Sequence, residues 1–217
     1  MSNILPVAAI VAIFLFLLKE TFELLRRSGE RRRKRTAIRE LLQHEVAENY
    51  RVLNCLFSAI DSTTRDEILP DENDTIVVQQ SGRREYARVD ENGLLVSGRP
   101  LPPVSTVEFN RLLPSAAELD KKLYSEIRLG YQHVHQLDHL VNSFVDFLTG
   151  NPKEREIFFG GFRQYALGCY DEIDRGLRRL YVVLAGKELD YKGLRRTPRL
   201  TKSSTHEVPA AGPAVNH

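Results

Sequence analysis

Apolar side chains run without interruption near the start of the chain. Residues 4–18 read ILPVAAIVAIFLFLL, and a partly apolar face continues beyond Lys19 to Leu25. A helix that spans a bilayer needs about 20 apolar residues, and a lysine stem can lie along apolar surface while its amine reaches the headgroups. The start lacks the positive residues and the small-residue cleavage site of a signal peptide. The pattern predicts an uncleaved transmembrane anchor over residues 1–25.

A basic juxtamembrane segment, residues 26–35, follows this predicted anchor. Its basic side chains are Arg26, Arg27, Arg31, Arg32, Arg33, Lys34 and Arg35. Because Lys and Arg near a membrane span favour the cytoplasmic side, we expect a single-pass inner-membrane protein with its N-terminus outside and the rest in the cytoplasm. Anionic lipid headgroups would then attract the basic side chains. The membrane is therefore one expected partner.

Residues 36–189 are expected to form a cytosolic helical domain. Apolar positions recur alternately three and four residues apart in three stretches, which is the spacing of a helical seam. The first seam comprises Leu42, Val46, Asn49, Leu53, Leu56 and Ile60, and the second comprises Ile127, Gly130, Val134, Leu137, Val141, Phe144 and Leu148. The third comprises Phe159, Phe162, Ala166, Cys169, Ile173, Gly176, Leu180 and Val183. The chain is thus predicted to be mainly α, with an antiparallel bundle of three long helices over residues 36–60, 116–149 and 152 onward.

Capping residues place the ends of these helices. Ser115 with Glu118 three residues later has the form of a capping box, which predicts that the second long helix starts after Ser115. Gly150 is a typical helix stop, and Asn151-Pro152 is a typical helix start. The second and third helices are therefore expected to be joined by a very tight turn.

Residues 61–103 interrupt the helical pattern. The stretches TIVVQQ, REYARV and ENGLLVSG, with a turn signal at Asn92-Gly93, predict an insertion that forms a β-hairpin or three short strands. Ser105 and Glu108 then predict a short capped helix that Pro114 ends. Residues 190–217 are rich in Arg, Ser, Thr and Pro and are expected to form a disordered basic tail.

Charge is distributed unevenly along the chain. The 217 residues carry a formal net charge of +2, but segments 26–35 and 191–217 carry +6 and +4, which leaves −8 for the remainder. Basic runs bind phosphate backbones, although no aromatic platform or nucleic-acid-binding module accompanies these runs. Nucleic-acid binding by the two basic segments is therefore an alternative that the pattern disfavours. The two cysteines, Cys55 and Cys169, lie in apolar helical surroundings and are expected to be free thiols.

The best candidate for a metal site is the stretch HVHQLDH at residues 133–139. His135 and His139 lie four residues apart, a spacing that puts two metal ligands on one helical face, and His44 with Glu48 repeats that spacing. However, the seam assignment places all three histidines on outward faces, whereas ligand sets in bundles point inward. A membrane-tethered metal-dependent enzyme that uses the His135/His139 face is therefore an alternative, and the leading expectation is no metal and no cofactor.

No catalytic signature is present, so the leading hypothesis is a membrane-anchored cytosolic binding or scaffold protein rather than an enzyme. It would act through protein–protein contacts, with a separate partner or with further copies of itself. Aromatic side chains that could anchor such contacts, or instead complete the core, are Phe147, Phe158, Tyr165, Tyr170 and Tyr181.

Three stretches carry a loose family resemblance: HEVAENYRVLN in the first helix, PPVSTVEFNRLL before the second and LDKKLYSEIRLGYQH within it. With the apolar N-terminus, the chain resembles uncharacterised bacterial single-pass membrane proteins that have a cytosolic helical domain. Because those proteins have no assigned activity, the resemblance implies a topology and no function.

Overall fold

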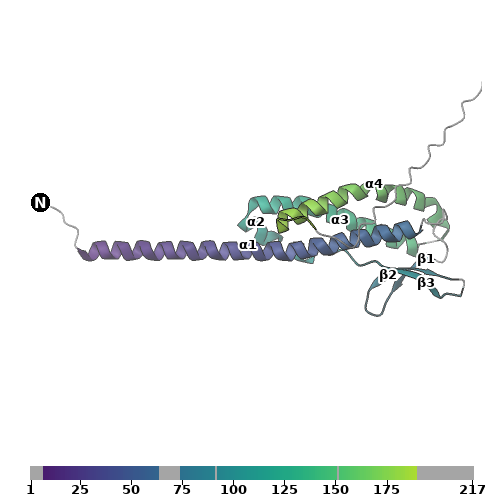
Figure 1. The fold of residues 1–217 in the computed structure, drawn as a ribbon, viewed down its shortest axis with the longest axis horizontal. Helices are drawn as coiled ribbons and strands as arrows, with labels where there is room; N and C mark the ends of the chain where they lie inside the picture. The colour runs from purple at the N-terminus through teal and green to yellow at the C-terminus, as the bar shows by residue number, and fades with distance from the viewer. Residues whose placement is uncertain (1–6, 64–73, 91, 151, 190–217) are drawn as a thin grey trace, which may run out of the picture.

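The computed structural model describes residues 7–63, 74–90, 92–150 and 152–189, and this part of the chain is mainly helical. The elements in chain order are α1 (Val7–Thr63), β1 (Asp74–Val78), β2 (Arg84–Val89), β3 (Leu95–Pro100), α2 (Val107–Leu119), α3 (Lys121–Thr149) and α4 (Pro152–Ala185). Figure 1 shows a helical body with a small sheet at one end and one long helix that projects from the other end.

The projecting helix is the N-terminal part of α1, which is continuous over 57 residues. At 1.5 Å per residue its length is about 85 Å. Among the described side chains of α1, Ile38 is the first that is buried in the core, and the part of α1 before it extends away from the body (Figure 1). The predicted anchor, the basic segment 26–35 and the helix predicted from residue 36 therefore share a single helix from Val7 onward.

The prediction of a transmembrane anchor is wrong. Among the described residues, no helix combines the length and the apolar character that a membrane crossing requires. From Val7, where α1 begins, the uninterrupted apolar run has only 12 residues, and Lys19, Glu20 and Glu23 follow it. A span needs about 20 apolar residues. This finding overturns the anchor over residues 1–25, the single-pass topology and the inner-membrane location together.

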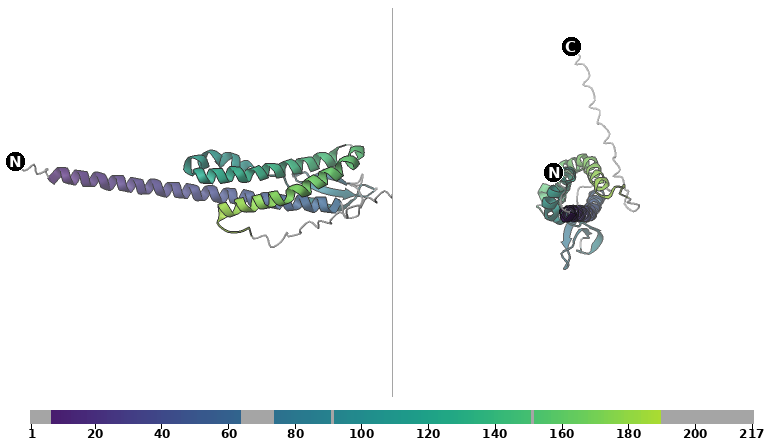
Figure 2. Two further views of the ribbon diagram at one scale, coloured as in Figure 1. Left: turned by 90° about the horizontal axis from the view of Figure 1, so that it is seen from above. Right: turned by 90° about the vertical axis from the view of Figure 1, so that its left-hand side faces the viewer.

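The C-terminal half of α1, α3 and α4 pack into the main body, and Figure 2 shows α3 and α4 lying alongside that half of α1. All six positions of the first predicted seam and all seven of the second are buried. In the third seam Ala166, Cys169, Ile173 and Leu180 are buried, and Phe162, Gly176 and Val183 are half-buried, while the side chain of Phe159 lies outside the described ones. The periodicity of the sequence therefore identified the core faces of these helices.

Two predicted helix boundaries are wrong. The short helix does not end at Pro114, because α2 continues through it to Leu119. Ser115 consequently lies inside α2 and caps nothing, and the start of α3 is capped by Asp120, whose carboxylate accepts hydrogen bonds from the backbone N–H groups of Lys122 and Leu123 at 3.0 and 3.1 Å. The core burial of Ala116, two residues beyond the proline, offsets the hydrogen bond that Pro114 cannot donate.

Gly150 and Pro152 do mark the helix ends that the sequence predicted. Gly150 is the C-cap of α3, and its backbone N–H donates to the carbonyl of Asp146 at 2.9 Å. α4 begins at Pro152. Predictions for residues 1–6, for Asn151 and for the 190–217 tail lie outside the described residues.

Three short strands form an antiparallel sheet in the order β1-β2-β3, as one of the two sequence alternatives predicted. Gly93 adopts φ of 76° in the turn between β2 and β3, where a residue with a side chain would be strained. Fully buried Asp74 accepts a hydrogen bond from the Tyr86 hydroxyl at 2.8 Å and pairs with Arg88 at 3.0 Å. This cluster ties β1 to β2 on the side of the sheet that faces the helices.

Candidate functional site

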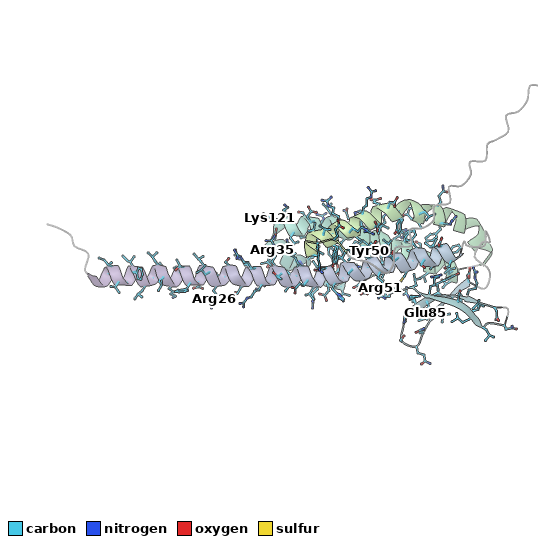
Figure 3. All side chains as sticks on the ribbon, in the orientation of Figure 1. Arg26, Arg35, Tyr50, Arg51, Glu85 and Lys121 are labelled. Carbon is cyan, nitrogen blue, oxygen red and sulfur yellow. The ribbon has the colours of Figure 1, made fainter. Side chains whose placement is uncertain are left out.

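The projecting part of α1 exposes a dense set of large apolar side chains, which we call the apolar segment, residues 10–25. Its members are Ile10, Val11, Ile13, Phe14, Leu15, Phe16, Leu17, Leu18, Phe22, Leu24 and Leu25, each between 42% and 68% exposed. In Figure 3 the side chains of this half of α1 radiate from the helix with no other element beside them. Contiguous exposed apolar surface of this extent is typical of interaction sites, whereas isolated apolar residues are common on any protein surface.

A basic collar, residues 26–35, separates the apolar segment from the helical body. Its seven Arg and Lys side chains are exposed. Arg27 pairs with Glu23 at 2.9 Å and Arg26 with Glu30 at 3.8 Å, in both cases one turn away. Because successive helical residues are rotated by about 100°, the four consecutive cations at 31–34 point to different sides of α1. The expected contact of these side chains with anionic lipid stays a prediction.

Arg35 marks the junction between the basic collar and the body. Its guanidinium forms an ion pair with Asp120, the residue that caps α3, and Figure 3 shows Arg35 at the end of the body where Lys121 begins that helix. The backbone N–H of Leu123 and the nearby Arg35 guanidinium lower the pKa of the Asp120 carboxyl. Asp120 therefore stays ionised and holds the start of α3 against α1.

A buried carboxylate, Glu45 on α1, organises the start of α2. One of its oxygens accepts hydrogen bonds from the Ser105 hydroxyl at 2.8 Å and the backbone N–H of Glu108 at 2.9 Å. The other accepts from the backbone N–H of Phe109 at 3.0 Å and from the hydroxyl of Tyr131 on α3. Thr106, the N-cap residue, makes no side-chain capping bond. Glu45 therefore caps α2 from a different helix, and the predicted cap of Ser105 with Glu108 is wrong.

Asn49, one turn after Glu45, completes this attachment. Its amide oxygen accepts a hydrogen bond from the backbone N–H of Ser105 at 2.8 Å, and its amide nitrogen donates to the Ser105 carbonyl at 2.7 Å. The polar residue on the first seam thus serves a tertiary contact. The three stretches that carry the family resemblance meet here, since they contain Glu45 and Asn49, Ser105, and Tyr131 respectively.

A second polar cluster joins α1 to α4. The Tyr50 hydroxyl donates to Asp174 at 2.8 Å, and Arg178 donates to both Asp174 and the Tyr50 oxygen. Burial and the neighbouring Asp174 carboxylate raise the pKa of Tyr50 to about 12. On the same pair of helices the rings of Phe57 and Tyr170 meet edge to face with centroids 4.7 Å apart. These contacts are structural, because every group in them is satisfied by another side chain of the body.

The candidate metal ligands do not converge. His44, His135 and His139 are all exposed, and the Glu48 carboxylate accepts hydrogen bonds from Arg51 at 2.7 and 3.0 Å. Within the described part of the chain, no three His, Cys, Asp or Glu side chains form a group that could hold a metal ion. Cys55 is half-buried and Cys169 is buried, and both are free thiols.

Most of the proposed aromatic anchors contribute to the core instead. Phe147 stacks on Phe162 with centroids 6.3 Å apart, and the buried Tyr181 hydroxyl accepts a hydrogen bond from Gln43 at 3.1 Å. Tyr165 is 49% exposed, and the side chain of Phe158 lies outside the described ones.

A small cavity of about 60 Å³ lies between α3 and α4, lined by Glu126, Leu129, Gly130, His133, Gly176, Arg179 and Leu180. It is far smaller than the several hundred Å³ that a small-molecule site occupies. The two glycines let the helices approach closely: a β-carbon at Gly130 would come within 2.8 Å of the Leu180 β-carbon, and one at Gly176 within 2.1 Å of the His133 ring.

Comparison of the chain with protein-family models, with curated proteins and with solved structures gave no match. At the sheet, Leu94, Leu95 and Val96 form a run of three exposed apolar residues, whereas the apolar segment exposes 11 large apolar side chains over residues 10–25. It is therefore the candidate functional site.

Proposed function

We propose that this protein is a helical scaffold that binds other proteins by helix–helix contact through the apolar segment of α1, and that the partner is a second copy of the same chain. The contiguous exposure of the apolar segment carries the proposal. Burial of apolar surface is the main driving force for protein association, at about 25 cal/mol per Å². A helix that leaves Phe14 and Phe22 more than 60% exposed in a single chain gains stability when another surface covers it.

The spacing of the apolar side chains supports a helical partner. Val11, Phe14, Leu18, Phe22 and Leu25 follow one another at intervals of three or four residues, the spacing by which two helices interlock their side chains. A second copy supplies the same spacing. The basic collar keeps the apolar segment clear of the body, so such a contact leaves the helical body unchanged.

The experiment is a mass measurement on the full chain by light scattering coupled to size-exclusion chromatography, over a range of concentrations. We expect a multiple of the 24.8 kDa chain mass, which Phe14→Asp/Phe22→Asp reduces to the mass of one chain because each copy would have to bury two charges in the contact. Val78→Asp is the matched control, since Val78 is a 63% exposed apolar residue on β1. A parent chain that stays monomeric throughout would overturn the proposal.

A further inference from the structure

We infer that two copies of α1 pair antiparallel, along a stripe formed by Val11, Phe14, Leu18, Phe22 and Leu25, with a two-fold axis at Leu18. This inference rests on the proposed self-association and adds its geometry.

The five side chains of the stripe lie on one face of the helix. With about 100° of rotation per residue, they all fall within about 40° of the direction of Leu18. The charged residues that interrupt the apolar segment lie elsewhere: Lys19 is about 100° from Leu18, and Glu20 and Glu23 are about 140–160° from it. The stripe is therefore free of charge over its whole length. Ile13 and Phe16 lie on the opposite face, and this pairing leaves them uncovered.

The stripe is symmetric about Leu18. Phe14 and Phe22 lie four residues before and after it, and Val11 and Leu25 lie seven residues before and after it. An antiparallel copy therefore places Phe14 opposite Phe22 and Val11 opposite Leu25, while Leu18 meets its own counterpart. A contact in which the same surface serves both subunits is the interface of a two-fold dimer, the commonest symmetric assembly.

Charge decides between antiparallel and parallel pairing. A parallel pair would align the two basic collars and bring like charges within the Debye length of about 8 Å at physiological salt. The ion pairs of Arg26 and Arg27 with Glu30 and Glu23 offset only part of the seven positive charges. In the antiparallel pair Arg26 lies opposite Ile10, so the two collars begin 16 residues apart, about 24 Å along the axis. Antiparallel pairing thus avoids the repulsion.

The helical body leaves room for the partner helix. In the antiparallel pair Val7 of the partner helix lies opposite Gly29. A β-carbon placed on Gly29 would have no other atom within 4 Å, so the space beside this residue is open. The body begins further along, where Arg35 contacts Asp120. The described part of the partner helix therefore ends before it reaches the body.

Cysteine cross-linking on the full chain tests the geometry. In a Cys55→Ser/Cys169→Ala background, mild oxidation is applied to Val11→Cys alone, to Leu25→Cys alone and to a mixture of the two after exchange of subunits. Antiparallel pairing predicts that only the mixture gives a covalent dimer. Ile13→Cys mixed with Leu25→Cys is the matched control, and we expect no covalent dimer because Ile13 lies on the opposite face.

The outcomes separate this inference from the proposed function. A covalent dimer in the mixture alone, with a parent mass of two chains, supports both. If the parent associates and the Val11→Cys variant alone forms a covalent dimer, the two helices are parallel. That result overturns the inference and leaves the proposed self-association standing. A monomeric parent with no cross-link in any sample overturns both.

Discussion

Replacing Glu45 with Gln tests whether one buried carboxylate holds α2 onto α1 and α3. Each carboxylate oxygen accepts two hydrogen bonds, one of them from a backbone N–H at the start of α2. A glutamine has the same shape but replaces one oxygen with an amide nitrogen, which only donates. Either Glu108 or Phe109 is therefore left with a buried N–H that has no acceptor.

The magnitude follows from these contacts. A buried donor without a partner costs about 1–3 kcal/mol, and loss of a negative charge at a helix N-terminus costs about 0.3–1 kcal/mol more. We expect Glu45→Gln to lower the free energy of unfolding by about 2–3 kcal/mol. Glu45→Ala removes both acceptors and leaves a cavity, so the loss should be larger, about 4 kcal/mol.

Urea unfolding followed by circular dichroism, at one protein concentration for all variants, measures these differences. Glu40→Gln is the matched control, because Glu40 is an exposed carboxylate on the same helix and surface substitutions change stability by less than about 0.5 kcal/mol. If Glu45→Gln unfolds at the same urea concentration as the parent and Glu40→Gln, the capping role assigned to Glu45 is refuted.

Two further predictions concern the packing of α3 on α4 and the tyrosine that joins α1 to α4. Gly130→Ala should destabilise the protein by about 1–3 kcal/mol, because its β-carbon would overlap Leu180. Gly168→Ala is the control: the space at that position is open, so the higher helix propensity of alanine should stabilise the protein by about 0.5–1 kcal/mol. Thermal unfolding compares the two variants, and equal effects would contradict the close approach at Gly130. Because the pKa of Tyr50 is raised to about 12 in the folded protein and is about 10 when unfolded, its contribution is complete below pH 10 and is lost as the pH rises to 12. Urea unfolding should therefore show that the free energy of unfolding falls between pH 9 and pH 11 by about 1 kcal/mol less in Tyr50→Phe than in the parent. An identical fall in both proteins would contradict the raised pKa of Tyr50.

The repeating apolar positions allowed the core to be predicted, because a helix buries whichever face carries its seam. Leu42, Leu53, Val134 and Phe144 are fully or almost fully buried as that rule requires. The end of α2 was not predictable in the same way. Pro114 is a strong local stop signal, and the burial of Ala116 in the core is a tertiary contact that the local pattern does not show.

The apolar segment shows the opposite difficulty. Its composition predicts a membrane span because the apolar run extends from Ile4 to Leu18 and a partly apolar face continues to Leu25. The described helix begins at Val7 and reaches Lys19 after 12 residues. The sequence offers one signal for the cap that Glu45 provides to α2: Glu45 flanks the first seam, four residues before the polar seam residue Asn49. It does not show which backbone N–H groups the Glu45 carboxylate meets.

The unbroken course of α1 from Val7 to Thr63 makes it a spacer of fixed length and fixed rotation. From Leu18 to Ile38, the first core residue, the helix advances about 30 Å, so whatever binds at Leu18 is held at that distance from the body. Removing seven residues between these positions would shorten the spacer by about 10 Å with only about 20° of rotation, whereas removing two would turn the body by about 160° relative to the apolar segment. The number of residues in this one helix thus sets both how far the body stands from its partner and which side it presents.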